Sequence, residues 1–150
     1  MPTGADYVAD AVALGVDEVM IDRLVRQFYA EVRLDPVLGP IFEARIADWE
    51  PHLRRMCTFW SSVMLRTGAY HGQPMPMHAR LPIDGAHFDR WLGLFEITAR
   101  HVCGPAAALF IDRAHRIAQS LELGIGGSRG LMLRTDERLP PLTLPEGASS

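Results

Sequence analysis

The side chains of this chain that could do chemistry are a histidine, a tyrosine and a tryptophan in largely apolar surroundings. His78 lies in the proline-rich segment 74–82, and a neutral imidazole is a common metal ligand. Tyr29 and Trp91 lie on apolar helical stripes, where a hydroxyl or an indole N–H needs a hydrogen-bond acceptor. Each residue also has an ordinary explanation, a surface imidazole or an aromatic core side chain. These three side chains can form a functional site only if the fold brings them close together.

Composition restricts the classes of protein to which the chain can belong. With 150 residues, 48% of them hydrophobic, it has the size and apolar content of one packed domain. The net charge of −3 disfavours binding to nucleic acid, which needs a basic surface. Cys57 and Cys103 are far apart, so neither a disulfide framework nor a cysteine-rich zinc site is expected. Without a basic leader or an apolar run of about 20 residues, we expect a cytoplasmic protein with no membrane contact.

The elements that must position these residues are helices, because apolar residues recur at helical spacing and no segment alternates as a strand does. Asp17, Asp48 and Asp84 are candidate N-caps, and Asp35 precedes a proline that ends a helix. We expect long helices at about 17–35, 48–67, 84–103 and 105–124, a turn at 38–42 and a short helix at 77–81. The predicted fold class is all-α.

The chain divides into three regions. Residues 1–15 are expected to form a loose or short helical lead, and residues 16–127 the packed domain. Glycines at 124, 126 and 127 are expected to end the last helix. The tail, residues 128–150, is rich in proline and polar residues, which predicts disorder or an interaction tail. The sequence assigns no function to the lead or the tail.

Four local patterns occur in one order along residues 20–122. They are RQFYAEVR with DPVLGPIF (residues 26–42), WEPHLRRMCTFW (49–60), YHGQPMPMHARLPI (70–83) and HFDRWLGLFEIT (87–98). Together they resemble the third group of truncated haemoglobins, and GQPMPMH is the most distinctive of them. The resemblance implies a truncated globin fold, in which two crossed helix pairs enclose a haem b.

The resemblance also implies roles for individual residues. His78 matches the histidine that holds the iron, and an imidazole on one face leaves the other face open for a gas. Tyr29, His52 and Trp91 match residues on the distal side, where the gas binds. Phe42 matches the aromatic residue at the porphyrin edge.

Further residues are candidates for contact with the haem because of their place in the sequence. The apolar candidates for the haem wall, besides Phe42, are Met56, Leu81, Phe88, Leu92 and Phe95. Cationic side chains favour the haem propionates, and the candidates are Arg55, His71 and Arg80. Apolar residues at helical spacing are core by default, so these assignments depend on His78.

Three functions remain open at this point. The first is a haem protein that binds O₂, CO or NO, with oxygen transport as the generic family label and an unidentified reductase as partner. The second is a haem enzyme, an NO dioxygenase or a peroxidase, although the acid nearest after His78 is Asp84, which is better used as a helix cap. The third is a helical interaction module without haem. A di-iron bundle is disfavoured because no Glu-x-x-His pair exists.

Overall fold

The structure is a computed structural model, and it describes residues 4–66, 83–128, 133 and 137–140. These residues form six α-helices and one 3₁₀ helix, and no strand occurs among them. The elements are α1 (Gly4–Ala13), α2 (Glu18–Leu34), α3 (Leu38–Glu43), α4 (Trp49–Leu65), α6 (Gly85–Cys103), η1 (Gly104–Ala106) and α7 (Ala107–Ser128). The predicted all-α fold class is confirmed.

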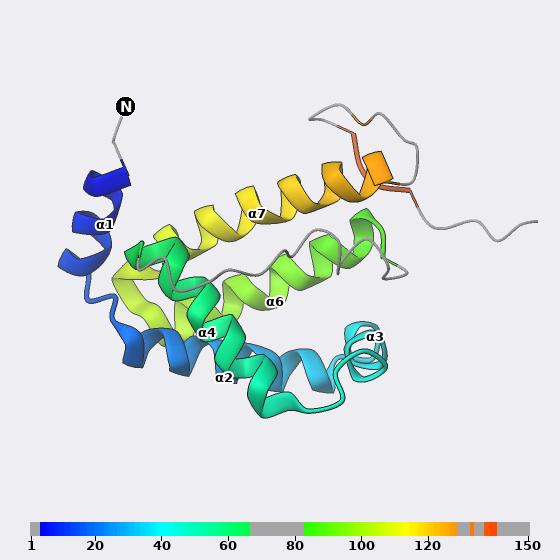
Figure 1. Cartoon of the computed structure of the whole chain (residues 1–150), viewed down its shortest axis with the longest axis horizontal. Helices are drawn as coiled ribbons and strands as arrows, with labels where there is room; N and C mark the ends of the chain where they lie inside the picture. Colours follow the sequence, from blue (N-terminus) through cyan, green and yellow to red (C-terminus); the bar gives the residue numbers. More distant parts are fainter. Residues whose placement is uncertain (1–3, 67–82, 129–132, 134–136, 141–150) are drawn as a thin grey trace, which may run out of the picture.

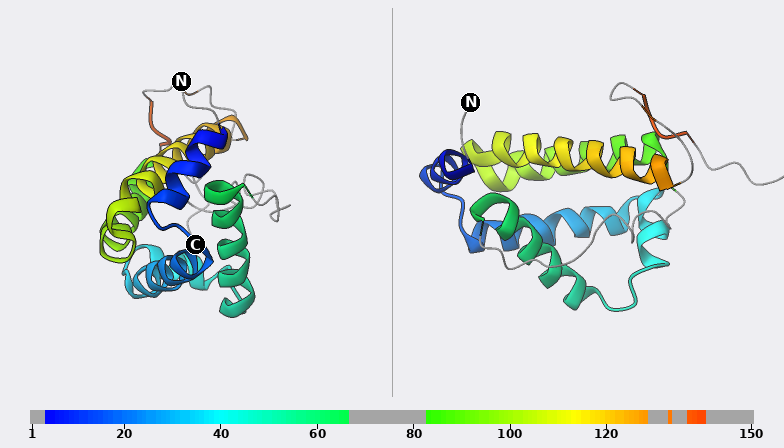
Figure 2. Two further views of the ribbon diagram at one scale, coloured as in Figure 1. Left: turned by 90° about the vertical axis from the view of Figure 1, so that its left-hand side faces the viewer. Right: turned by 45° about the horizontal axis from the view of Figure 1, so that its top comes forward.

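Two helix pairs make up the body of the molecule. The first pair is α6 and α7, which lie side by side as a hairpin joined through η1 (Figure 1). The second is α2 with α4, which crosses it, and α2 also packs along α6 (Figure 2). The main core lies between the pairs, and its fully buried side chains include Ile21, Leu24, Phe95 and Phe110.

Local signals fix the ends of α2. The Asp17 side chain accepts a hydrogen bond from the Met20 backbone N–H at 2.8 Å, as an N-cap should. The helix ends at Leu34 because Asp35, which precedes a proline, takes an extended conformation with ψ 128°. Its buried stripe is Ile21, Leu24, Val25, Phe28, Tyr29 and Val32, the helical spacing that the sequence predicts.

The start of α6 is fixed by a capping box. Asp84 accepts hydrogen bonds from the backbone N–H groups of Ala86 (2.8 Å) and His87 (3.2 Å), and His87 Nδ1 accepts one from the Asp84 N–H (3.0 Å). The predicted cap at Asp84 is confirmed. At the far end Gly104, with φ 53°, takes a conformation that suits glycine and turns the chain into η1.

The last helix is longer than the sequence predicts. It continues through Gly124, Gly126 and Gly127 to Ser128, so the prediction that these glycines end it is wrong. Glycine costs a helix about 1 kcal/mol per residue relative to alanine. Ile125, between them, is completely buried, and that packing outweighs the unfavourable propensity.

Both ends of the chain contribute to the packing. The lead forms the helix α1, and Ala11 and Val16 are buried in the main core. In the tail, Leu139 is only 2% exposed. Burial of Leu139 and the hydrogen bond from its backbone N–H to Glu122 hold residues 137–140 against the fold. The disorder expected for the tail as a whole stays a prediction.

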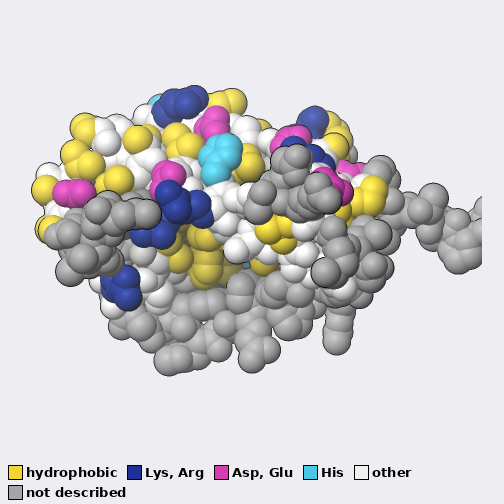
Figure 3. Space-filling model, turned by 90° about the horizontal axis from the view of Figure 1, so that it is seen from above, with side chains coloured by type: hydrophobic (Ala, Val, Ile, Leu, Met, Phe, Trp, Pro, Cys, Tyr) yellow, Lys and Arg dark blue, Asp and Glu magenta, His cyan; other side chains and the backbone are white. Residues whose placement is uncertain are grey.

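The hairpin of α6 and α7 is long and apolar enough to be a candidate for a membrane span. The stretch Gly85–Gly127 meets the length and hydropathy criteria for a span, but 44% of its most apolar window is buried inside the fold. A core helix of a globular protein meets the same criteria, so this is weak support for a span. On the face seen from above, arginine and carboxylate side chains are interspersed (Figure 3).

Candidate functional site

A cavity lies between the two helix pairs. It contains about 830 Å³ of empty space, part of which is open to solvent. Its lining residues come from five helices and from Ile83, two residues before α6: Tyr29, Leu38, Phe42, Met56, Phe59, Trp60, Ile83, His87, Phe88, Trp91, Ile117, Ala118 and Leu121. The wall is mainly apolar and aromatic, with a few polar groups among these side chains.

Tyr29 carries one of these polar groups. It lies on the buried stripe of α2 and is 7% exposed. Its ring packs edge-on against Phe28, Phe42 and His52, at centroid distances of 5.1, 6.0 and 5.0 Å. Burial raises the pKa of the Tyr29 hydroxyl well above its ordinary value. The hydroxyl therefore stays protonated and can donate a hydrogen bond.

His52 lies beside Tyr29 at the start of α4. Its ring stands edge-on to both Tyr29 and Trp49, with centroid distances of 5.0 and 5.7 Å. His52 is not among the residues that line the cavity, whereas Met56, one turn further along α4, is. The structure therefore brings His52 to the tyrosine, one layer away from the cavity wall.

Trp91 belongs to the opposite wall, on α6. Its indole stacks on Phe95 at 5.6 Å with an interplanar angle of 15° and meets Phe28 edge-on at 5.4 Å. Phe95 in turn stacks on Trp60 at 5.1 Å. This packing fixes the plane of the Trp91 ring, and the indole N–H is a donor without acceptor capacity.

The short helix α3 delivers Leu38 and Phe42 to the cavity. Asp35, 9% exposed, accepts hydrogen bonds from the Leu38 N–H (2.8 Å) and from Arg90 Nε (2.7 Å). These bonds hold the pKa of the Asp35 carboxyl below its ordinary value, with Arg90 as the largest cause. A side chain at Gly39 would meet the Arg33 carbonyl at 2.8 Å, so α3 packs closely on the end of α2.

The structure brings many of the predicted site residues to this cavity. Those that line it are Tyr29, Phe42, Met56, Phe88 and Trp91. Arg55, the residue before Met56 on α4, is exposed and is not among the lining residues. Leu92 packs in the second apolar cluster and faces a groove between α6 and α7, and Phe95 lies beneath Trp91. The predicted residues His71, His78, Arg80 and Leu81 lie outside the described residues.

Sequence reasoning missed part of the lining. His87 is one turn before Trp91, so its spacing from that tryptophan was a signal that could have found it. Ile117, Ala118 and Leu121 of α7 also line the cavity, but a helical stripe does not distinguish a cavity wall from plain core. Among the described residues, no group of three or more His, Cys, Asp or Glu side chains could hold a metal ion.

Comparisons with known proteins define the class. The family model for bacterial-like globins matches residues 12–109. The group 3 truncated hemoglobin ctb of Campylobacter jejuni is 37% identical over 113 residues, which cover 71% of this chain and 89% of that protein. The crystal structure of a group III truncated hemoglobin from Campylobacter jejuni matches with a TM-score of 0.68 and 33% identity, covering 71% of this chain and 88% of that one.

The fold and these matches define a globin. Within that class, the chain belongs to the group III truncated haemoglobins, as its four sequence patterns indicate. The globin family implies a haem cofactor and a small gaseous ligand.

Proposed function

We propose that the cavity holds haem b, that His78 binds the iron, and that the protein binds O₂ and other diatomic gases. The observation that carries the proposal is the presence of hydrogen-bond donors in a mainly apolar cavity wall, among them the buried Tyr29 hydroxyl and the Trp91 indole. A cytoplasmic location and a separate reductase belong to the same proposal.

The residues present fit this cofactor. A porphyrin is a flat apolar disc, and the cavity offers aromatic and aliphatic walls on both sides, from α4 and from α6 with α7. Phe42, Met56 and Phe88 would contact the disc. When bound, the haem supplies an iron that takes a diatomic gas.

Tyr29 is the principal donor to the gas. Its raised pKa keeps the hydroxyl protonated, so it donates and does not compete as an anion for the iron. A bound O₂ carries partial negative charge and accepts such a hydrogen bond. When the gas leaves, a buried donor is left without that acceptor, which costs free energy and slows release.

Trp91 and His52 have different parts in the proposal. Trp91 offers a second donor, in an orientation that Phe95 and Phe28 restrict. His52 contacts the ring of Tyr29 but does not itself line the cavity. Its part in the proposal is therefore to hold Tyr29 in position. Two donors favour tight binding or sensing over bulk transport.

The test is reconstitution of the apoprotein with haem, followed by ferric, ferrous and CO-bound absorption spectra. Wild type should show a Soret band that shifts sharply with CO. His78→Gly should retain haem poorly or show an altered band, and added imidazole should restore the spectrum because it replaces the missing ligand. His115→Gly, a change at an exposed histidine on α7, is the matched control and should resemble wild type.

Two results would contradict the proposal. If wild type takes up no haem, the interaction module becomes the better account. If His78→Gly has the wild-type spectrum, the haem is present and another residue holds the iron.

A further inference from the structure

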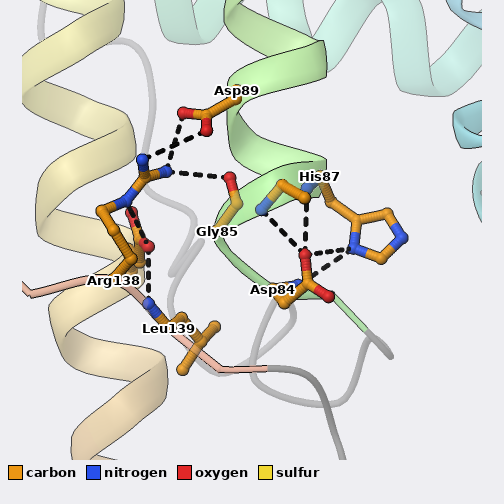
Figure 4. A network of polar contacts seen from close by, with 8 residues as sticks. Asp84, Gly85, His87, Asp89, Arg138 and Leu139 are labelled. Atoms are coloured by element: carbon orange, nitrogen blue, oxygen red, sulfur yellow. Dashed lines mark hydrogen bonds and ion pairs between the residues drawn. The ribbon is translucent and has the colours of Figure 1, made fainter.

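Residues 137–140, called the strap here, cross the first turn of α6 and the end of α7. Arg138 donates to Glu122 through Nε (2.9 Å), and through Nη2 to the Gly85 carbonyl and to Asp89 (both 2.8 Å). The Gly85 N–H donates to the Leu139 carbonyl at 2.8 Å. Figure 4 shows the contacts of Arg138 with Asp89 and with the Gly85 carbonyl, next to the turn that Asp84 caps. The strap thus joins the two helices of the hairpin.

The centre of this network is Glu122, which is 7% exposed. Its carboxylate accepts from Arg138 Nε and from the Leu139 backbone N–H at 2.7 Å. A buried carboxylate needs such partners, and loss of the cation would leave an uncompensated charge. The pair with Asp89 is exposed and contributes much less.

The apolar half of the strap is Leu139. It is 2% exposed and belongs to a cluster with Ile83, Phe88 and Ala118. These three neighbours also line the cavity. The strap therefore supports the outer side of residues whose inner side forms the cavity wall.

We propose that the strap is a latch that retains the cofactor, with Arg138 as the positioning residue that holds it closed. This rests on the proposed function, since the cofactor is the haem of that proposal. Fixing the first turn of α6 fixes Phe88 and His87 in the wall, and a loosened strap lets that wall open. The strap lies beyond residues 12–109, which the globin family model matches.

The first test compares haem loss from reconstituted variants into an excess of a haem-scavenging apoprotein. Arg138→Ala should lose haem faster by about tenfold or more, because Glu122 then stays buried without its cation. Adding Glu122→Gln to that variant should restore much of the retention, since glutamine removes the charge and its carbonyl still accepts from Leu139. The control is Val102→Ala, a buried change at the distant end of α6, compared at equal distance below each unfolding midpoint.

A second pair of variants changes no charge. A Cβ on Gly85 would lie 3.0 Å from Glu122 Oε1 and 3.2 Å from the Arg138 Cβ, so Gly85→Ala should displace the strap and speed haem loss. Gly93→Ala is the matched control on the same helix, because nothing lies within 4 Å of its added Cβ. It should leave haem retention unchanged.

Hydrogen exchange at the Gly85 amide reports strap closure independently of haem, because this N–H bonds to Leu139. Arg138→Ala should lose that protection in the apoprotein, and Val102→Ala should keep it. If Arg138→Ala loses protection at Gly85 but retains haem like wild type, the latch proposal is overturned while the proposed function stands. If wild type takes up no haem, the proposed function fails, and the latch proposal fails with it.

Discussion

The cavity and the strap use polar groups in opposite ways, although both depend on the first turns of α6. In the strap, the guanidinium of Arg138 is distributed over two carboxylates and a carbonyl. In the cavity, the Tyr29 hydroxyl and the Trp91 indole lie in a wall that is mainly aromatic and aliphatic. Polar groups in such a setting interact strongly with whatever enters, because the surroundings screen them poorly.

The difference indicates that the polar groups of the cavity serve gas binding, whereas those of the strap and the other anchors serve stability. Changes to the donors of the cavity should alter the binding of a gas and leave folding almost untouched. Changes to the anchors, which include the Asp35–Arg90 pair as well as the strap, should alter folding.

The largest effect is expected in the cavity. Tyr29→Phe keeps the ring and removes the hydroxyl, so O₂ release should become about 10- to 100-fold faster, since a hydrogen bond to a charged acceptor contributes about 1.5–3 kcal/mol. Stopped-flow measurement of O₂ dissociation from the ferrous protein checks this. An unchanged rate, with the thermal midpoint also unchanged, would show that Tyr29 is only a core residue.

The next effect tests the packing of α3. Gly39→Ala places a Cβ 2.8 Å from the Arg33 carbonyl, and overpacking of this kind costs about 1–3 kcal/mol of unfolding free energy. Gly93→Ala, with open space around its Cβ, should instead stabilise α6 by up to about 1 kcal/mol. Urea unfolding of both variants checks the contrast. Equal effects at the two glycines would contradict the close approach of α3 to α2.

A smaller kinetic effect is expected at Trp91. Trp91→Phe removes the indole N–H and keeps an aromatic ring against Phe95, so O₂ release should become about 2- to 10-fold faster. Trp60→Phe is a matched control in the opposite wall, also stacked on Phe95. If the control changes the rate as much as Trp91→Phe, the effect is not specific to Trp91, and its role as the second donor is contradicted.

The smallest effect appears only in acid. The pKa of Asp35 is lowered in the folded protein from its ordinary value of 3.8, so its ionised form stabilises the fold fully above that pH. This contribution is lost as the pH falls below 3.8 through the lowered value. Asp35→Asn should therefore show a shallower fall in unfolding free energy below about pH 4 than wild type. Parallel acid titrations of the two proteins would refute the role of the Arg90 pair.

The sequence predicts elements whose causes are local. The caps at Asp17 and Asp84 and the end of α2 at Asp35 each depend on a few neighbouring residues, and the structure has them where expected. The continuation of α7 past Gly124 depends on the burial of Ile125, which is a tertiary effect.

The site shows the same division between features that the local sequence determines and features that depend on distant residues. Tyr29 and Trp91 were recognisable because their types and family pattern identify them. The strap was not recognisable, since Arg138 binds partners 16 and 49 residues away and its own segment has the composition of a disordered tail. His87 was not among the residues singled out from the sequence, and in the structure it both completes the capping box of α6 and lines the cavity.

The most direct test of the central claim is a haem titration of the apoprotein, followed by tryptophan fluorescence. Trp60 and Trp91 line the cavity, so one haem per chain should quench most of the emission. Ala118→Phe fills the same cavity and should weaken binding strongly, whereas Ala108→Phe, at an exposed position of the same helix, should bind as wild type does. If Ala118→Phe binds haem as tightly as wild type, the haem binds elsewhere and the account is contradicted.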